Sequence, residues 1–241
     1  MCHSLSELEI LTVNIGAKCS DGIALIADKK YTNISLGNEN FDNKVFGDAA
    51  HFLTLFTGQY KAFDIFRKYV VRDMIINQND NDITKHYTFN NIISKFADLV
   101  KKFNESIDKP GSKFELLTAL HQYKQSELYY INTKGESEKV TDYKAIGSGR
   151  KTANIFCETL QHNEIRMKDF IKQAYLAIMF MDKYCPELGV SVEADGIPNI
   201  KYLYYNTEWD LEPTQQDIEW YKEYVHDRLG QIRETFERIK Y

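Results

Sequence analysis

The segment from Thr12 to Asp28 restricts the fold of this chain more than any other, because it has the pattern of a buried two-stranded hairpin. Residues 12–18 have the composition of a short strand, and Asp21-Gly22 is a strong signal for a two-residue turn. Residues 23–27 form an apolar run that is typical of a strand buried on both faces. Such a hairpin brings Asp28, at the end of its second strand, back to Thr12 at the start of its first.

Lys44 begins the next strand pattern, and it is the third candidate site residue after Thr12 and Asp28. A threonine hydroxyl, a carboxylate and a lysine that converge at one strand end are the components of an activated hydroxyl nucleophile. The alternative is an ordinary strand threonine beside a structural ion pair between Asp28 and Lys44.

Strand and helix patterns follow one another in blocks along the rest of the chain. Strands are predicted at residues 52–58, 114–121, 127–132, 143–146, 190–194 and 200–204, and helices at 60–76, 89–103, 150–162, 168–184 and from Pro213 onward. Runs of strands that alternate with helix pairs differ from βαβ units and fit two sheets packed face to face. We therefore predict an α+β fold, a four-layer αββα sandwich of two mostly antiparallel sheets flanked by helices, with residues 12–241 as its single domain.

Composition restricts the classes of function. The chain has 241 residues and 43% apolar content, which suffices for one packed domain. A net charge of −5 with scattered lysines and arginines argues against a nucleic-acid surface, and no apolar run approaches the length of a membrane span. The dispersed cysteines and histidines lack ligand spacing, so we expect reduced thiols, no metal and no cofactor. These observations favour a cytoplasmic protein.

The hairpin residues resemble the proteasome β-subunit branch of the N-terminal-nucleophile (Ntn) hydrolases. That family has a T-x-x-x-G strand, a D-G turn, an A-D-K/R-R strand end and a K-[VIL]-F strand start. This chain carries the matching residues in one register without a gap: Thr12 to Gly16, Asp21-Gly22, Ala27-Asp28-Lys29-Lys30, Thr32, Lys44-Val45-Phe46, Gly58 and, later, Gly147-Ser148-Gly149. The resemblance implies the αββα fold.

The resemblance also implies a role for each site residue. Thr12 would be the nucleophile, and its own α-amino group, with an unperturbed pKa of about 8, would be the base. Lys44 would lower the pKa of that amine and hold the hydroxyl, while Asp28 would orient Lys44. Gly58 would contribute to the oxyanion hole, and Ser148 would support the amino terminus.

The substrate-binding residues implied by the resemblance are Thr32, Tyr31, Phe56 and Tyr60. Phe56 occupies the position of the floor of the first specificity pocket, and Tyr31 and Tyr60 occupy flanking wall positions. Bulky aromatic side chains there favour a shallow pocket. Core packing is an equally good interpretation of Phe56.

The chain departs from the family pattern on both sides of the site. Leu11 stands where the family's propeptide usually ends in glycine. Cys185 and Leu188 stand where the family has an aspartate and a serine, although Gly189 keeps part of that turn. Residues 1–11 are either a propeptide or a disordered tail.

The function that the sequence predicts is therefore a threonine-type peptide hydrolase that forms an acyl-enzyme on Thr12. Its partners would be a peptide or unfolded-protein substrate and the other subunits of a homo- or hetero-oligomeric ring, without nucleic acid or membrane. One alternative is a catalytically silent proteasome-like subunit that keeps residues 1–11, and another is an Ntn amidase for a non-protein amide. Cys2, exposed by loss of Met1, is a further candidate nucleophile, but no strand pattern follows it.

Overall fold

A computed structural model of the chain describes residues 12–33, 38–41, 44–48, 52–58, 60–70, 88–106, 113–122, 125–158, 164–192, 196–205 and 210–239. The predictions for residues 1–11 and for the ends of the helices at 60–76 and 150–162 lie outside these ranges. In the part that is described, no helix is long and apolar enough to cross a membrane.

Two five-stranded sheets, in which every strand pair is antiparallel, form the centre of the molecule. The first has the order β10 (Tyr143–Gly147), β1 (Val13–Lys18), β2 (Gly22–Ala27), β11 (Asn199–Tyr204) and β12 (Asp210–Leu211). The second has the order β5 (Val45–Asp48), β6 (Phe52–Thr57), β7 (Glu115–Gln122), β8 (Gln125–Ile131) and β9 (Ser137–Val140). A separate hairpin pairs β3 (Lys30–Asn33) with β4 (Asn38–Phe41).

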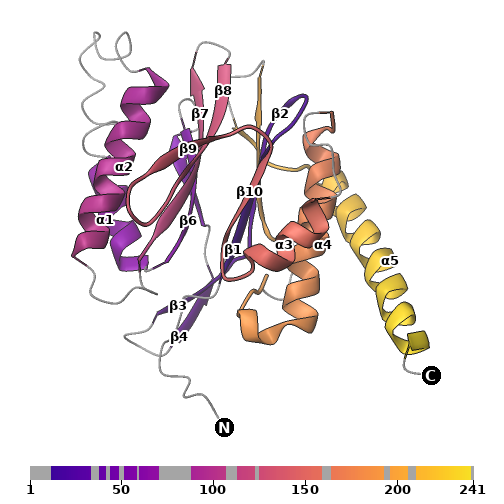
Figure 1. Cartoon of the computed structure of the whole chain (residues 1–241). Helices are drawn as coiled ribbons and strands as arrows, with labels where there is room; N and C mark the ends of the chain where they lie inside the picture. The colour runs from indigo at the N-terminus through magenta and orange to yellow at the C-terminus, as the bar shows by residue number, and fades with distance from the viewer. Residues whose placement is uncertain are drawn as a thin grey trace.

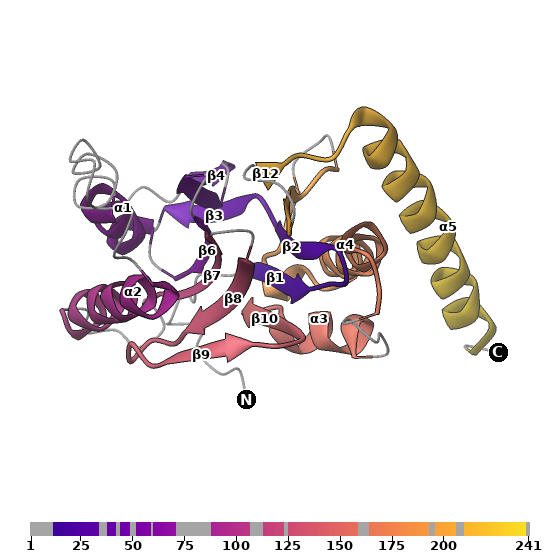
Figure 2. The ribbon, with the colours of Figure 1, turned by 90° about the horizontal axis from the view of Figure 1, so that it is seen from above.

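Helices cover the outer faces of both sheets, so the layers run helix, sheet, sheet, helix (Figure 1). The helices α1 (Tyr60–Val70) and α2 (Phe89–Glu105) lie against the second sheet, and α3 (Arg150–Cys157) and α4 (Met167–Tyr184) lie against the first. The long helix α5 (Gln215–Ile239) lies on the far side of α4, as the view from above shows (Figure 2). The predicted four-layer αββα fold is confirmed.

Three apolar clusters fill the spaces between these layers. The strand β2 illustrates the division: Ile23 and Leu25 belong to the cluster between the two sheets, whereas Ala24 and Ile26 belong to the cluster under α3, α4 and α5. Both sets are fully buried, which confirms a strand buried on both faces. A third cluster packs α1 and α2 on the second sheet.

The turn of the β1–β2 hairpin lies one residue earlier than the Asp-Gly pattern predicts. The Cys19 amide donates to the Gly22 carbonyl at 2.7 Å, so Ser20 and Asp21 form the turn. Gly22 is already in β2, where a Cβ atom would lie 2.3 Å from the Leu203 carbonyl oxygen. Glycine is needed there for close approach to β11 rather than for the turn.

The predicted strand at residues 190–194 is wrong over its described part, residues 190–192, which is irregular. The Ser191 carbonyl instead accepts the amides of Lys29 at 2.9 Å and Lys30 at 3.3 Å. The strand β11 pairs with β2 and β12, so it does not need a strand from this segment. The sequence pattern also missed β9, a short strand of mostly exposed polar residues.

Replacing Gly22 by alanine should lower the free energy of unfolding by about 1–3 kcal/mol, because the added methyl group has no room beside Leu203 and Met167. Gly230→Ala is the matched control. Gly230 is exposed in α5 with no atom within 4 Å of a new Cβ, so alanine should raise stability by about 0.5–1 kcal/mol. Urea unfolding of both variants measures the difference, and equal effects would contradict the packing argument.

Candidate active site

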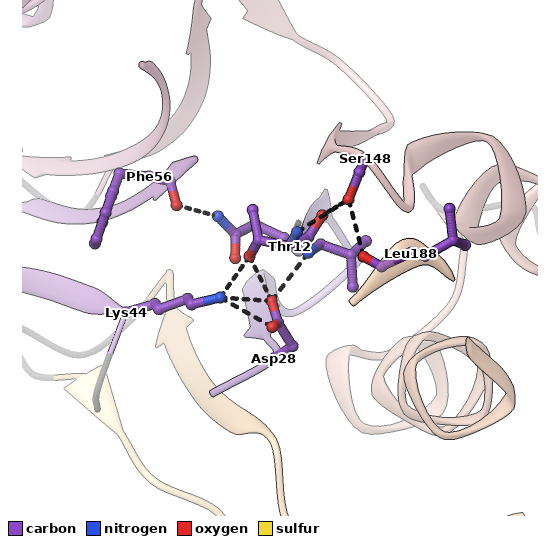
Figure 3. A network of polar contacts seen from close by, with 8 residues as sticks. Thr12, Asp28, Lys44, Phe56, Ser148 and Leu188 are labelled. Atoms are coloured by element: carbon purple, nitrogen blue, oxygen red, sulfur yellow. Dashed lines mark hydrogen bonds and ion pairs between the residues drawn. The ribbon is translucent and has the colours of Figure 1, made fainter. Parts of the chain in front are cut away.

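Three side chains far apart in the sequence meet at the start of β1 (Figure 3). The Thr12 hydroxyl donates to Asp28 Oδ1 at 2.5 Å and accepts from Lys44 Nζ at 2.5 Å. Lys44 Nζ also lies 2.9 Å from both carboxylate oxygens of Asp28. The structure therefore brings together the three residues that the sequence placed at this strand end.

The hairpin and the second sheet position these residues. In the β1–β2 pairing Asn14 lies opposite Ala27, and the Asp28 amide donates to the Val13 carbonyl at 3.1 Å. Asp28 therefore lies beside Thr12, as the hairpin pattern predicts. Lys44 immediately precedes β5 and so reaches the site from the other sheet.

The site is shielded from water. The exposed fractions of Thr12, Asp28 and Lys44 are 1%, 0% and 2%. Asp28 accepts three donors, namely the Thr12 hydroxyl, the Val13 amide at 2.9 Å and the Lys44 ammonium. A buried carboxylate is tolerated only when its charge is paired and its lone pairs are hydrogen-bonded in this way.

Burial lowers the pKa of Lys44 below its ordinary value, because the charged form is deprived of water. The charge of Asp28 and its hydrogen bond oppose this shift, and the nearby charge of Lys30 adds to it. The net shift means that Lys44 holds its proton less firmly than a surface lysine does. Its Nζ atom donates to the Thr12 hydroxyl, so Lys44 is placed to hold and polarise that group.

Ser148, between β10 and α3, holds the backbone of Thr12. The Thr12 N–H donates to Ser148 Oγ at 2.9 Å, and Ser148 Oγ lies 3.1 Å from the Thr12 carbonyl oxygen. The Gly149 amide also donates to that carbonyl, at 3.2 Å. The nitrogen of Thr12 is therefore fixed by the residue that the resemblance assigned to it.

The turn after α4 contacts this support through its backbone. The Leu188 carbonyl oxygen lies 3.2 Å from Ser148 Oγ (Figure 3). Leu188 ends a short 3₁₀ helix (Pro186–Leu188), and Gly189 follows in the left-handed region with φ 59°. A main-chain acceptor thus reaches Ser148 from the turn in which the resemblance set Cys185 and Leu188 against an aspartate and a serine.

Gly58 follows β6 and has φ 105°, a conformation that other L-residues rarely adopt. A Cβ atom there would also lie 2.4 Å from the Lys113 carbonyl oxygen. The backbone at the predicted oxyanion position therefore requires glycine. Its role in an oxyanion hole stays a prediction.

The Phe56 carbonyl faces Thr12, while the Phe56 ring extends away from it (Figure 3). Phe56 is 3% exposed, and its ring stacks on Phe63 of α1 with a centroid distance of 3.5 Å. These contacts support the core-packing interpretation of Phe56. Its role in a specificity pocket stays a prediction.

The other predicted substrate-binding residues are placed only by their backbones. Tyr31 and Thr32 lie in β3, which begins two residues after Asp28, and Tyr60 is the first residue of α1. Their side chains lie outside the described part of the structure, so their contacts with substrate stay predictions.

Sequence reasoning missed two polar residues next to the site. Asn14, two residues after Thr12, is fully buried, and Glu115 begins β7 opposite Thr57. A detectable signal for Asn14 is its place among apolar residues in a strand pattern. In the described ranges, no group of three or more His, Cys, Asp or Glu side chains could hold a metal ion.

An αββα sandwich with a threonine hydroxyl at the start of its first strand is the arrangement of the Ntn-hydrolase fold. The model of the proteasome subunit family matches residues 12–185. The chain belongs to the proteasome subunit family.

Solved structures agree with this fold at low sequence identity. Anbu (ancestral beta-subunit) from Yersinia bercovieri has a TM-score of 0.73 and 12% identity, over 93% of this chain and 97% of that chain. An Anbu (Gly-1) mutant from Hyphomicrobium sp. strain MC1 has a TM-score of 0.72 and 14% identity, over 94% of this chain and 97% of that chain. No curated protein sequence matches the chain.

Replacing Lys44 by methionine should lower the free energy of unfolding by about 3–5 kcal/mol, because the buried Asp28 carboxyl loses the partner of its ion pair. Lys68→Met is the control. Lys68 pairs with Asp64 at 2.6 Å, but its side chain is 72% exposed, so the loss should be about 0–1 kcal/mol. Chemical denaturation measures both losses, and similar small values would contradict the stabilising role of the Lys44–Asp28 pair.

Proposed function

We propose that this chain is a threonine-type peptide hydrolase in which Thr12 forms an acyl-enzyme. The observation that carries the proposal is the Thr12 hydroxyl, held at 2.5 Å from both Lys44 Nζ and Asp28 Oδ1 in a buried site. A threonine hydroxyl is a weak nucleophile until a base removes its proton. The proposal gives this polar cluster a chemical role beyond that of a structural ion pair.

The first event would be cleavage between Leu11 and Thr12, which converts the Thr12 amide nitrogen into a free α-amine. That nitrogen already lies 2.9 Å from Ser148 Oγ. The amine, with a pKa of about 8 before perturbation, would be partly neutral near neutral pH and could accept the hydroxyl proton. The ammonium group of Lys44 would lower the pKa of the amine further.

In the reaction itself, Thr12 Oγ would attack the scissile carbonyl carbon, and its proton would pass to the α-amine. The tetrahedral oxyanion would be stabilised by the Gly58 N–H. The amine would then protonate the leaving nitrogen, so the C–N bond breaks and an ester to Thr12 remains. A water molecule, deprotonated by the same amine, would hydrolyse the ester and release the acid.

A silent proteasome-like subunit is the second candidate, and two specific observations favour it. Leu11 replaces the family's glycine before the nucleophile, and Cys185 and Leu188 replace polar residues of the turn. In this reading the Lys44–Asp28 pair is structural and residues 1–11 remain attached. An Ntn amidase for a non-protein amide would use the same chemistry with another substrate, because a fold does not determine its substrate.

Intact-mass measurement should show a mature chain that begins at Thr12 and hydrolyses peptides. Thr12→Ala should retain residues 1–11 and lose activity, because it lacks the hydroxyl. Thr12→Ser keeps a hydroxyl and is the conservative control, so it should still be processed. An active wild-type preparation that contains only chains beginning at Met1 or Cys2 would contradict the proposed mechanism.

We also propose that the chain assembles into a closed ring, as proteasome subunits generally do. Closed head-to-tail rings join identical subunits without forming fibres. Exposed apolar side chains on the outer helices support the proposal: Ile65 and Tyr69 on α1 are 43% and 44% exposed, and Ile155 on α3 is 70% exposed. Each is also an ordinary surface residue when taken alone.

Light scattering at tens of micromolar should detect an oligomer of about six or more subunits, the size that family geometry implies. Ile155→Lys should weaken this assembly if α3 lies at a subunit contact, whereas Lys151→Glu on the same helix tests charge alone. A monodisperse wild-type monomer would rule out the homomeric ring.

A further inference from the structure

Asn14 is a polar residue in the apolar space between the two sheets. Its neighbours Val13 and Ile15 point into the cluster under the helices, so the side chain of Asn14 faces the other sheet. There Asn14 Nδ2 donates to the Phe56 carbonyl of β6 at 2.5 Å. This hydrogen bond joins the strand that carries Thr12 to the strand that leads to Gly58.

Burying the side-chain amide of Asn14 costs folding free energy. Asn14 is 0% exposed, and among the described residues its Oδ1 atom has no hydrogen-bond partner. An unsatisfied buried carbonyl lowers stability, and an apolar side chain would avoid that cost. Core packing alone therefore does not account for an asparagine at this position.

Glu115 holds the same end of β6 from another direction. Its Oε1 atom accepts the Thr57 hydroxyl at 3.3 Å and the Gly147 amide at 3.4 Å. Its Oε2 atom accepts the Tyr130 hydroxyl at 2.5 Å. The carboxylate thus joins Thr57, which precedes Gly58, to Gly147, which precedes Ser148.

We propose that Asn14 and Glu115 are positioning residues that hold the Gly58 N–H in place relative to Thr12 and Ser148. Asn14 fixes the Phe56–Thr57 peptide against β1, and Glu115 fixes Thr57 against the Gly147–Ser148 segment. The inference rests on the proposed function, in which Gly58 stabilises the oxyanion. Misplacement of such a donor by about 1 Å can reduce turnover about 100-fold.

The test uses Asn14→Leu, which removes the hydrogen bond to Phe56 and keeps a branched side chain with the same number of non-hydrogen atoms. Thr118→Val is the matched control. Thr118 lies in β7, and its Oγ1 atom forms a buried hydrogen bond of 3.1 Å with Oγ1 of Thr54, two residues before Phe56 in β6. Glu115→Leu removes the contacts with Thr57 and Gly147. Glu115 is partly exposed, so this substitution disturbs the apolar core less than one at Asn14. Glu115→Gln keeps an acceptor oxygen and should restore the behaviour of the wild type.

The first readout is amide hydrogen exchange at Thr57 and Gly58 in the full chain. Exchange there should rise about tenfold in Asn14→Leu and Glu115→Leu and stay unchanged in Thr118→Val and Glu115→Gln. The second readout is peptide hydrolysis. In the first two variants kcat should fall about 10- to 100-fold with KM within about twofold, because the lost interaction acts in the transition state.

The two readouts separate the inference from the proposed function. Amide hydrogen exchange can be measured in a protein without activity. A wild-type protein that does not hydrolyse peptides would therefore count against the proposed function alone. Exchange at Thr57 and Gly58 would still decide whether Asn14 and Glu115 hold this segment. Unchanged exchange at Thr57 and Gly58 in Asn14→Leu would overturn the inference. A kcat equal to that of the wild type in both Asn14→Leu and Glu115→Leu would overturn it as well.

Discussion

The ion pair between Lys44 and Asp28 is the interaction on which the site depends, because it links the two sheets where Thr12 lies. Asp28 ends a strand of the first sheet, and Lys44 leads into the second. The pair is buried, so neither charge can turn to water if its partner moves. The distance between the sheets at this end and the position of the Thr12 hydroxyl are therefore set by the same contact.

The layers and the position of Asp28 beside Thr12 could be predicted from the sequence because they depend on local periodicity, whereas the role of Lys44 was predicted from the resemblance to the proteasome β-subunits. An apolar run after a turn signal fixed the hairpin, and the hairpin fixed Asp28 beside Thr12. The turn itself was misplaced by one residue, since Gly22 serves close packing against β11, which no local pattern reveals. The direction of the Phe56 ring was equally hidden, because a strand pattern does not say which face meets a helix.

The remaining parts of the site depend on backbone contacts and long-range pairs. Leu188 supports Ser148 with a carbonyl group, so the residue type at that position predicts nothing about the contact. Asn14 and Glu115 gain their significance from partners in other strands, at Phe56 and Gly147. Such contacts become visible only when the strand order is known.

The hydrogen bond from the Thr12 nitrogen to Ser148 bears on when the chain could be cleaved relative to its folding. It exists while Thr12 is still an interior residue, with Asp28 and Lys44 already assembled from positions 16 and 32 residues away. In the proposed mechanism, activation is then an irreversible covalent event that needs no rearrangement of the site. Only a chain that has completed its fold could undergo it, so cleavage before Thr12 would act as a quality check on folding.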